Sequence, residues 1–327
     1  MFNKLELSYI KGADINVPDT SIYEYLLMRS RRSGNRIVSK CHEDELALAR
    51  LQAESEIYAK AFKKLGVREG DIVPMCLPPC NEALIAFFAL NRLGAVSTFL
   101  SAASSGEELE KYIKRFDSRF FLTTPKHAAE LPEIIENCGL DQTVVITSQD
   151  ALGTVKDPCA LTRALLANPS GYPSHDRIMS LTALRNLGRN AVGSPDARPS
   201  MKRPAFISYT SGTTGEPKAI YMSNENIIAE IISELKTSLI PLGPRGTALQ
   251  VVPFNYPYGF IISTLVPIYA GRTAGLTPLL TLSGVKDYLS MYRPYLIFAI
   301  PSFYNYMKGA PEFERFDLSF LKYAASG

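Results

Sequence analysis

The sequence has little net charge and no apolar run of membrane-spanning length. Its 35 Lys and Arg residues nearly balance 32 Asp and Glu residues. The two signs are interspersed, so no basic stripe is present that would follow a nucleic-acid backbone. The most apolar stretch, FIISTLVPIYAG, is too short to cross a bilayer and contains Pro267. These absences predict a protein that neither binds nucleic acid nor spans a membrane.

Cysteine and histidine are scarce. Five cysteines are an odd number and cannot all pair within one chain, which favours a reducing compartment. Cys76 and Cys80 lack a second Cys or His pair nearby, so we interpret them as structural thiols. The three histidines show no metal-ligand spacing and are interpreted as surface residues: His42, His127 and His175. Because the first residues, MFNKLELSYIKGAD, lack an apolar segment of signal-peptide length, we predict a cytoplasmic protein.

The composition that remains is that of a folded α/β protein. Hydrophobic residues make up 46% of the 327 residues, enough to bury a large core or two moderate ones. REGDIVPMCLPP predicts a strand between turns, EALIAFFALNRLGA a buried helix ending near Gly94, and GAVSTFL a second strand. An amphipathic helix is predicted from Glu43 to Leu65, ended by Gly66. Strands that alternate with helices predict parallel β/α layers.

A connector rich in Gly, Pro, Ser and Arg runs from Leu184 to Pro204. We therefore predict a first β/α subdomain over residues 1–198 and a second over residues 199–327. After the connector the alternation resumes. PAFISYT, TALQVVP, YLIFAIP and FLKYAASG are predicted strands, and a helix with Ser223 as its N-cap follows the first of them.

The most informative segment is YTSGTTGEPKAI, which runs from Tyr209 to Ile220 and follows a predicted strand. Its glycines allow positive φ angles that turn N–H groups inward, its hydroxyls add donors, and Lys218 adds a positive charge. The spacing differs from GxxxxGK[ST], because no Ser or Thr follows Lys218. The residues alone leave two interpretations open, a surface turn or a loop that wraps phosphate oxygens.

The same segment closely resembles the phosphate loop of the adenylate-forming superfamily, which includes acyl- and aryl-CoA synthetases, luciferases and the adenylation domains of peptide synthetases. Ala219 stands where the family usually has Gly. The resemblance extends more weakly over nearly the whole chain, through REGDIVPMCLPPCNEALIAFFALNRLGAVSTFLSAASSGEELEKYI, VVPFNYPYGF, IFAIPSFYNYM and LKYAASG. It implies an α/β fold, with the layered β/α subdomains of the family's large N-terminal domain and without its C-terminal lobe.

The resemblance also implies a two-step reaction. A carboxylate attacks the α-phosphorus of ATP to give an acyl-adenylate and pyrophosphate, and the thiol of CoA or of a carrier-protein pantetheine then takes the acyl group. Lys218 and Thr214 are the implied catalytic residues, and Thr214 is also the implied Mg²⁺ ligand. The residues implied to bind or shape the triphosphate site are Thr210, Ser211, Gly212, Thr213, Thr214, Gly215 and Lys218.

VVPFNYPYGF resembles the segment that lines the acid pocket of the family. The implied pocket residues are Asn255, Tyr256, Gly259 and Phe303. Acyl-CoA synthetases usually carry PxFHxxG here, and the His position falls on Tyr256. Members that activate α-amino acids carry Asp after the Phe, whereas Asn255 follows Phe254 here. The residues by themselves also fit a simpler interpretation, in which Asn255 and Tyr256 cap a strand and fill core space.

Two acid classes fit this segment. Asn255 begins a stretch similar to the HNYP of aryl-acid-activating enzymes, in which Asn can bind a ring hydroxyl. The TSGTTG form of the loop and the bulky apolar residues near the pocket favour an acyl- or aryl-CoA ligase, which we rank first. Aryl-acid adenylation for a carrier protein, as in siderophore assembly, is the alternative.

Family members are usually much longer than this chain. The resemblance does not include the Mg²⁺-directing Glu, the ribose-binding Asp, the hinge or the small lobe with its catalytic Lys. We therefore expect these 327 residues alone to bind nucleotide weakly and not to complete the reaction. A binding module or an inactive relative is a further alternative.

Overall fold

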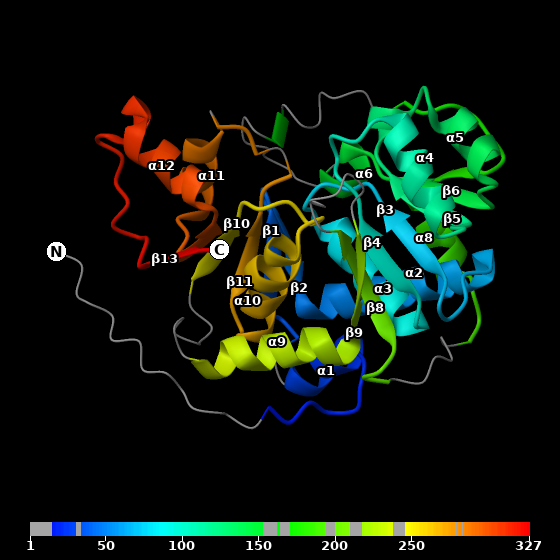
Figure 1. The fold of residues 1–327 in the computed structure, drawn as a ribbon, viewed down its shortest axis with the longest axis horizontal. Helices are drawn as coiled ribbons and strands as arrows, with labels where there is room; N and C mark the ends of the chain where they lie inside the picture. Colours follow the sequence, from blue (N-terminus) through cyan, green and yellow to red (C-terminus); the bar gives the residue numbers. More distant parts are fainter. Residues whose placement is uncertain are drawn as a thin grey trace.

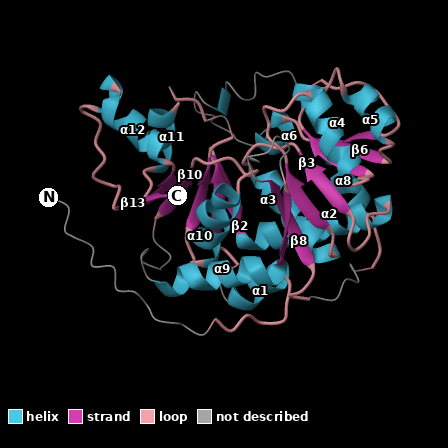
Figure 2. Ribbon diagram, viewed as in Figure 1, coloured by secondary structure: helices cyan, strands magenta, loops and turns pink. Residues whose placement is uncertain are grey.

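The structure is a computed structural model. It contains two β-sheets surrounded by helices (Figure 1, Figure 2). It describes residues 15–30, 34–152, 162–163, 171–193, 200–209, 218–237, 246–278, 280–282 and 284–327. Among these residues, no helix combines the length and the apolar character needed to cross a bilayer.

The first sheet has seven strands in the order β7-β6-β5-β3-β4-β8-β9. Their bounds are β3 Ile72–Met75, β4 Val96–Phe99, β5 Phe120–Thr123, β6 Gln142–Val145, β7 Ile178–Ser180, β8 Pro204–Tyr209 and β9 Ala219–Ser223. All neighbouring pairs are parallel except β8 and β9, which form an antiparallel pair at one edge.

The second sheet has six strands in the order β13-β12-β10-β11-β1-β2. Their bounds are β1 Ile37–Cys41, β2 Asp44–Ala47, β10 Thr247–Gln250, β11 Thr273–Leu276, β12 Leu296–Ala299 and β13 Tyr323–Ser326. Only β1 and β2 pair antiparallel. The predicted parallel β/α layers are confirmed.

Each sheet takes strands from both sides of residue 198. β1 joins the six-stranded sheet through parallel pairing with β11, where Ser39 lies opposite Ala274. β8 joins the seven-stranded sheet through parallel pairing with β4, where Ser97 lies opposite Phe206. The predicted boundary between residues 198 and 199 therefore does not coincide with the division of strands between the sheets. Turn-rich composition indicates a connector, but it does not indicate which sheet the next strand joins.

The helices lie around and between the sheets. Their bounds are α1 Ile22–Ser30, α2 Leu48–Leu65, α3 Asn81–Leu93, α4 Gly106–Arg115, α5 Leu131–Cys138, α6 Ser148–Leu152, α8 Leu181–Arg189, α9 Asn224–Thr237, α10 Val266–Tyr269, α11 Val285–Tyr292 and α12 Pro301–Gly309. The 3₁₀ turns Pro125–His127 and Pro311–Phe313 and the π-helix Tyr258–Leu265 complete the described elements. In Figure 1, α4 and α5 lie on the seven-stranded sheet, and α11 and α12 lie beside the six-stranded sheet.

Single residues next to the helices determine where several of them begin or end. Gly66 ends α2 with φ 99°, and Gly94 ends α3 with φ 76°, left-handed conformations that favour glycine. Ser223 caps α9, because its Oγ accepts the Asn226 N–H at 3.2 Å. The predicted start of α2 at Glu43 was wrong, because residues 44–47 pair with β1 as strand β2.

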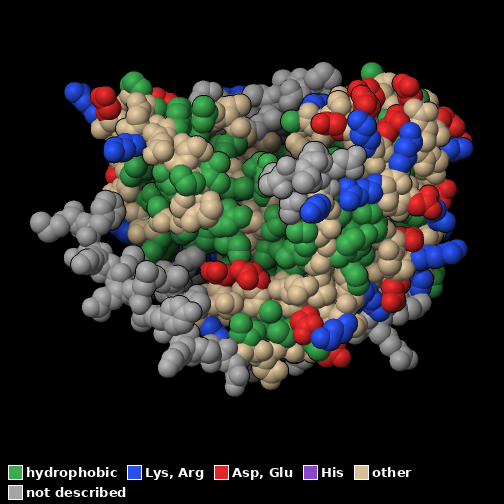
Figure 3. Space-filling model, viewed as in Figure 1, with side chains coloured by type: hydrophobic (Ala, Val, Ile, Leu, Met, Phe, Trp, Pro, Cys, Tyr) green, Lys and Arg blue, Asp and Glu red, His purple; other side chains and the backbone are tan. Residues whose placement is uncertain are grey.

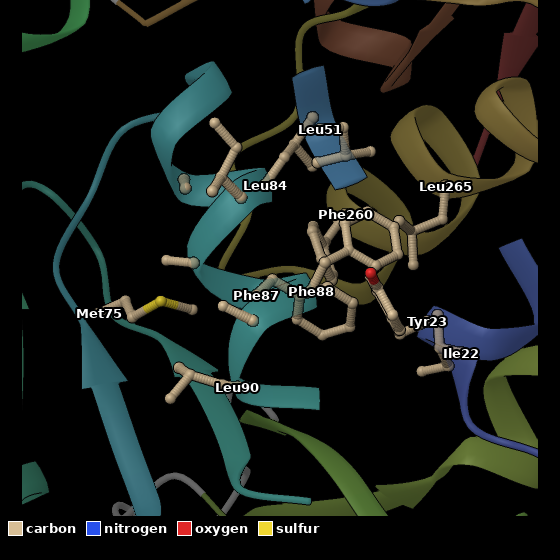
Figure 4. Close-up of a cluster of buried hydrophobic side chains, with 14 of the residues drawn as sticks. Ile22, Tyr23, Leu51, Met75, Leu84, Phe87, Phe88, Leu90, Phe260 and Leu265 are labelled. Carbon is tan, nitrogen blue, oxygen red and sulfur yellow. The ribbon is translucent and has the colours of Figure 1, made fainter. Parts of the chain in front are cut away.

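α3 forms the centre of the main core, which is continuous between the sheets. All its residues except Arg92 are buried, as expected of a helix that packs on every side. Phe87 and Phe88 of this helix gather with Phe260 of the π-helix (Figure 4), and the Phe87 and Phe260 ring centroids lie 4.6 Å apart. This packing connects α3 to the segment that was predicted to line the acid pocket.

Candidate active site

The carboxyl ends of the central strands of both sheets surround a cavity of about 220 Å³. It is lined by four loops: Leu77–Pro79 after β3, Leu100–Ala103 after β4, Val251 and Pro253–Asn255 after β10, and Thr277, Pro278 and Leu280 after β11. Ligands of open α/β sheets bind beyond the carboxyl ends of the strands. This cavity is therefore the candidate ligand site in the described part of the chain.

The predicted phosphate loop begins at the same edge. Because β8 runs parallel to β4, its last residue, Tyr209, lies at the edge that carries the cavity. The Tyr209 ring packs on Tyr112 of α4, with centroids 4.6 Å apart, and burial raises the pKa of its hydroxyl. Lys218 precedes β9 and is exposed. The other predicted triphosphate residues lie outside the described residues: Thr210, Ser211, Gly212, Thr213, Thr214 and Gly215.

The predicted acid-pocket residues do not share one cavity. Asn255 lines the cavity, whereas the side chain of Tyr256 is 53% exposed. Gly259 is buried at the start of the π-helix, where an added Cβ would lie 2.3 Å from the carbonyl oxygens of Val252 and Pro253. Phe303 is buried in the cluster that α11 forms with β10 and β12. The structure thus brings one of the four predicted residues, Asn255, to the cavity.

The π-helix at residues 258–265 is a feature that the apolar pattern did not predict. Ser263 Oγ donates to the Tyr258 carbonyl at 2.8 Å, and Thr264 Oγ1 donates to the Gly259 carbonyl at 2.9 Å. Both hydroxyls therefore bond to carbonyls five residues earlier within the π-helix, and π-helical turns are frequent at functional sites. The hydroxyl of Tyr258 is buried and has no hydrogen-bond partner among the described residues.

Sequence reasoning missed most of the cavity lining. Leu100 ends the strand predicted at GAVSTFL and is followed by the small residues 101–103, and Thr277 and Pro278 follow a strand that was not predicted. The sequence offered one signal for this lining: each of these loops follows a strand, and the loops that follow parallel strands meet at one edge of the sheet.

Two of the histidines are core residues, so their assignment to the surface was wrong. His42 is 2% exposed, with Nδ1 2.8 Å from Thr162 Oγ1 and Nε2 2.9 Å from Tyr288 Oη, and burial lowers its pKa. His127 is 3% exposed, with Nε2 3.7 Å from Cys76 Sγ and Nδ1 3.0 Å from Glu130 Oε2. Thr162, Tyr288 and Cys76 lie far from these histidines in the sequence. The local sequence around His42 and His127 therefore could not show that the two side chains are buried.

Burial raises the pKa of the Cys76 thiol to about 11. We predict that Cys76 reacts with iodoacetamide at pH 8 at least about 100-fold more slowly in the folded protein than in urea, because the thiolate is the reactive form. Mass spectrometry of the Cys76 peptide over time measures both rates. Comparable rates in the two conditions would contradict the buried environment of this thiol.

Charged residues of both signs are interspersed on the visible surface, mainly over the side that carries α4 and α5 (Figure 3). Within the described ranges, no three His, Cys, Asp or Glu side chains converge on a potential metal site. The predicted Mg²⁺ ligand, Thr214, lies outside those ranges. Mg²⁺ therefore stays a prediction.

The sequence pattern of the AMP-binding enzyme family matches residues 28–327. The chain belongs to the AMP-binding enzyme family. This AMP-binding chain is 26% identical to 4-coumarate–CoA ligase 2 of Oryza sativa subsp. japonica over 279 residues, which are 82% of this chain and 45% of that protein. It is 23% identical to a long-chain-fatty-acid–CoA ligase of Escherichia coli O6:H1 over 288 residues, 86% of this chain and 51% of that protein.

The fold of the AMP-binding chain is shared with a solved structure, the anthranilate CoA ligase AuaEII in complex with anthranoyl-AMP. The TM-score is 0.77 at 20% sequence identity, covering 95% of this chain and 55% of that chain. The AMP-binding chain thus spans about half the length of the relatives it matches. The predicted family resemblance and the predicted α/β fold are both confirmed.

Proposed function

We propose that this AMP-binding chain takes part in ATP-dependent activation of a carboxylic acid. The acid forms an acyl-adenylate with release of pyrophosphate, and the thiol of CoA then accepts the acyl group. The observation that carries this proposal is that β8, whose last residue Tyr209 begins the sequence YTSGTTGEPK, ends at the sheet edge where the β4 loop lines the cavity. The family match and the CoA ligases among the relatives support it.

The residues at this edge suit an anionic nucleotide. Lys218 is exposed and forms no ion pair with a described residue, so its charge is available to phosphate oxygens. Nucleotidyl transfer depends on aligning anionic groups and neutralising their charge. We assign this neutralisation to Lys218 together with the hydroxyl and N–H groups of residues 210–215. Mg²⁺, with Thr214 as its proposed ligand, would neutralise further triphosphate charge.

Aryl-acid adenylation for a carrier protein is the second candidate. It is favoured by Asn255, which lines the cavity and carries an amide that can hydrogen-bond a ring substituent. The similarity to an anthranilate CoA ligase supports an aryl acid but not a carrier protein. The two candidates therefore differ in the acceptor thiol, which is that of CoA in the first and that of a carrier protein in the second.

Acid-dependent exchange of labelled pyrophosphate into ATP by the complete polypeptide tests the proposal. The panel consists of fatty, aryl and amino acids, followed by CoA or a pantetheinylated carrier protein as acceptor. Exchange with one acid class is the expected result. Folded protein that binds ATP but exchanges with no acid would favour a binding module or an inactive relative.

Replacing Lys218 by alanine is expected to lower the kcat/KM of this exchange by at least about 100-fold, because a cationic partner of the transition-state charge is removed. The control is Lys308→Ala, since Lys308 is an exposed lysine at the end of α12. Circular dichroism and thermal unfolding confirm the fold of both variants. Exchange by Lys218→Ala at the wild-type rate would remove Lys218 from the site.

A further inference from the structure

We infer that the protein has a binding site for one Zn²⁺ ion, formed by the Cys76 thiolate, the His127 Nε2 atom and the Ser101 carbonyl oxygen. The inference goes beyond the proposed function, which gives Cys76 and His127 no role. Neither of these two side chains lines the cavity. The site uses two side chains and a backbone carbonyl, so it is consistent with the absence of three converging His, Cys, Asp or Glu side chains among the described residues.

The three ligands come from neighbouring strands of the seven-stranded sheet. β5, β3 and β4 lie side by side and run parallel, so the chain segments that follow them meet at one edge. Cys76 follows β3, Ser101 lies two residues after β4, and His127 ends the 3₁₀ turn after β5. The Cys76 N–H donates to the Leu122 carbonyl at 2.8 Å, so the chain just after β3 remains paired with β5. The sheet therefore places the ligands before an ion binds.

The distances between the ligand atoms suit a tetrahedral ion. Cys76 Sγ lies 3.7 Å from His127 Nε2 and 3.4 Å from the Ser101 carbonyl oxygen. Zinc bonds of about 2.3 Å to sulfur and about 2.1 Å to nitrogen or oxygen, at tetrahedral angles, place two ligand atoms about 3.6 Å apart. The sulfur and each of the other two atoms can therefore bind one ion with little movement.

The hydrogen bonds leave lone pairs directed at the sulfur. His127 Nδ1 lies 3.0 Å from Glu130 Oε2, and an ionised carboxylate only accepts. In the neutral imidazole, Nδ1 therefore carries the hydrogen and Nε2 presents its lone pair to the sulfur. The Ser101 carbonyl already accepts the Ser104 N–H at 3.0 Å. A histidine oriented by a carboxylate in this way is typical of metal sites.

The charges also suit a divalent cation. Burial raises the pKa of the Cys76 thiol to about 11, so the thiol keeps its proton without an ion. When Zn²⁺ binds, the S–H bond breaks, the proton passes to solvent and a bond between sulfur and zinc forms. The thiolate and the Glu130 carboxylate then balance the two positive charges. Lys126 opposes binding only weakly, because its ammonium is exposed and donates to the Ala102 carbonyl.

The ligand types select the kind of ion. Thiolate and imidazole bind Zn²⁺ well, whereas Mg²⁺ and Ca²⁺ prefer oxygen ligands. This site is therefore distinct from the Mg²⁺ proposed for the triphosphate. Three protein ligands are one fewer than in a closed structural zinc site, so water completes the coordination. We expect reversible binding that a chelator removes.

A cadmium titration tests which residues bind the ion. Cd²⁺ is a softer ion of the same charge, and its bonds to thiolates absorb in the ultraviolet. Chelator-treated protein is expected to show a band that saturates at one equivalent of Cd²⁺ and that Zn²⁺ removes. Cys76→Ser and His127→Gln are expected to lose this band. The controls Cys138→Ser, Cys159→Ser and His175→Gln are expected to keep it, and a band that persists in Cys76→Ser would overturn the inference.

A second variant leaves the three ligands in place. Glu130→Gln is expected to lower the affinity for Zn²⁺ by at least about tenfold, because the histidine loses its orienting carboxylate. Glu130 is exposed, so this variant tests the site even where Cys76→Ser does not fold. The matched control is Glu133→Gln, an exposed position of α5. Isothermal titration with Zn²⁺ measures the affinities. Equal affinities of the wild type and Glu130→Gln would contradict the site.

Thermal unfolding provides a readout that needs neither ATP nor an acid. Zn²⁺ at 0.1 mM is expected to raise the thermal midpoint of the wild type by at least about 2 °C, and EDTA is expected to reverse the shift. This result does not depend on pyrophosphate exchange, so it stands or fails separately from the proposed function. A wild type with neither the shift nor the cadmium band would show that Cys76 and His127 form a hydrogen bond only. A midpoint that falls would show that Zn²⁺ prefers the unfolded chain, and it would also overturn the inference.

Discussion

Replacing Gly259 by alanine is expected to lower the free energy of unfolding by about 3 kcal/mol. An alanine Cβ would lie 2.3 Å from the carbonyl oxygens of both Val252 and Pro253. These contacts are with backbone atoms, so no side-chain rotation relieves them. The chain between β10 and the π-helix would have to move, and it includes Asn255 in the cavity wall.

Urea unfolding of the wild type and of Gly259→Ala measures this loss. Gly309→Ala is the control, because nothing lies within 4 Å of a Cβ added at Gly309. A difference in unfolding free energy below about 1 kcal/mol would show that the turn relaxes easily and that Gly259 does not fix the wall.

The elements that could be predicted depend on interactions between residues close together in the sequence. Gly94 and Gly66 end helices because the left-handed conformation suits a residue without Cβ, and Ser223 caps α9 through its neighbour three residues on. Such features depend on residues within one turn, so one sequence is sufficient to find them.

The elements that could not be predicted depend on distant pairing. Asp44 begins strand β2 instead of continuing the helical pattern after Glu43, because β1 offers it a partner in the six-stranded sheet. His42 is buried because Tyr288, 246 residues away, supplies a hydrogen bond. The cavity joins loops from four strands of two sheets, and only the strand order shows that they meet.

A buried polar network holds the start of α3 against the six-stranded sheet. Asn81 Nδ2 donates to Asp44 Oδ2 at 2.7 Å, and Ser39 Oγ donates to Asn81 Oδ1 at 2.7 Å. The next residue, Glu82, is 1% exposed, and its Oε1 lies 3.5 Å from Arg185 Nη2 of α8 without a hydrogen bond among the described residues. Pro79, just before this network, lines the cavity. The network therefore sets the position of one cavity wall.

Glu82→Gln is expected to stabilise the protein by about 3 kcal/mol at pH 8 and to remove a pH dependence of the wild type. Burial, with a further contribution from Asp44, raises the pKa of the Glu82 carboxyl to about 7 from its usual 4.5. A raised carboxyl pKa means that the folded state binds the proton more tightly than the unfolded state. The contribution of Glu82 to stability is therefore complete below pH 4.5 and is lost as the pH rises to 7.

Urea unfolding of both proteins at pH 5, 6, 7 and 8 tests this expectation. The advantage of Glu82→Gln should grow across this range and level off above pH 7, because an amide cannot lose a proton. The control is Glu133→Gln, since Glu133 is an exposed glutamate of α5. A variant that is less stable than the wild type at pH 8 would show that the Arg185 ion pair outweighs the cost of burying the carboxylate. In that case Glu82 would stabilise the start of α3 as an anion, its folded-state pKa would lie below 4.5, and its contribution to stability would stay constant from pH 5 to pH 8.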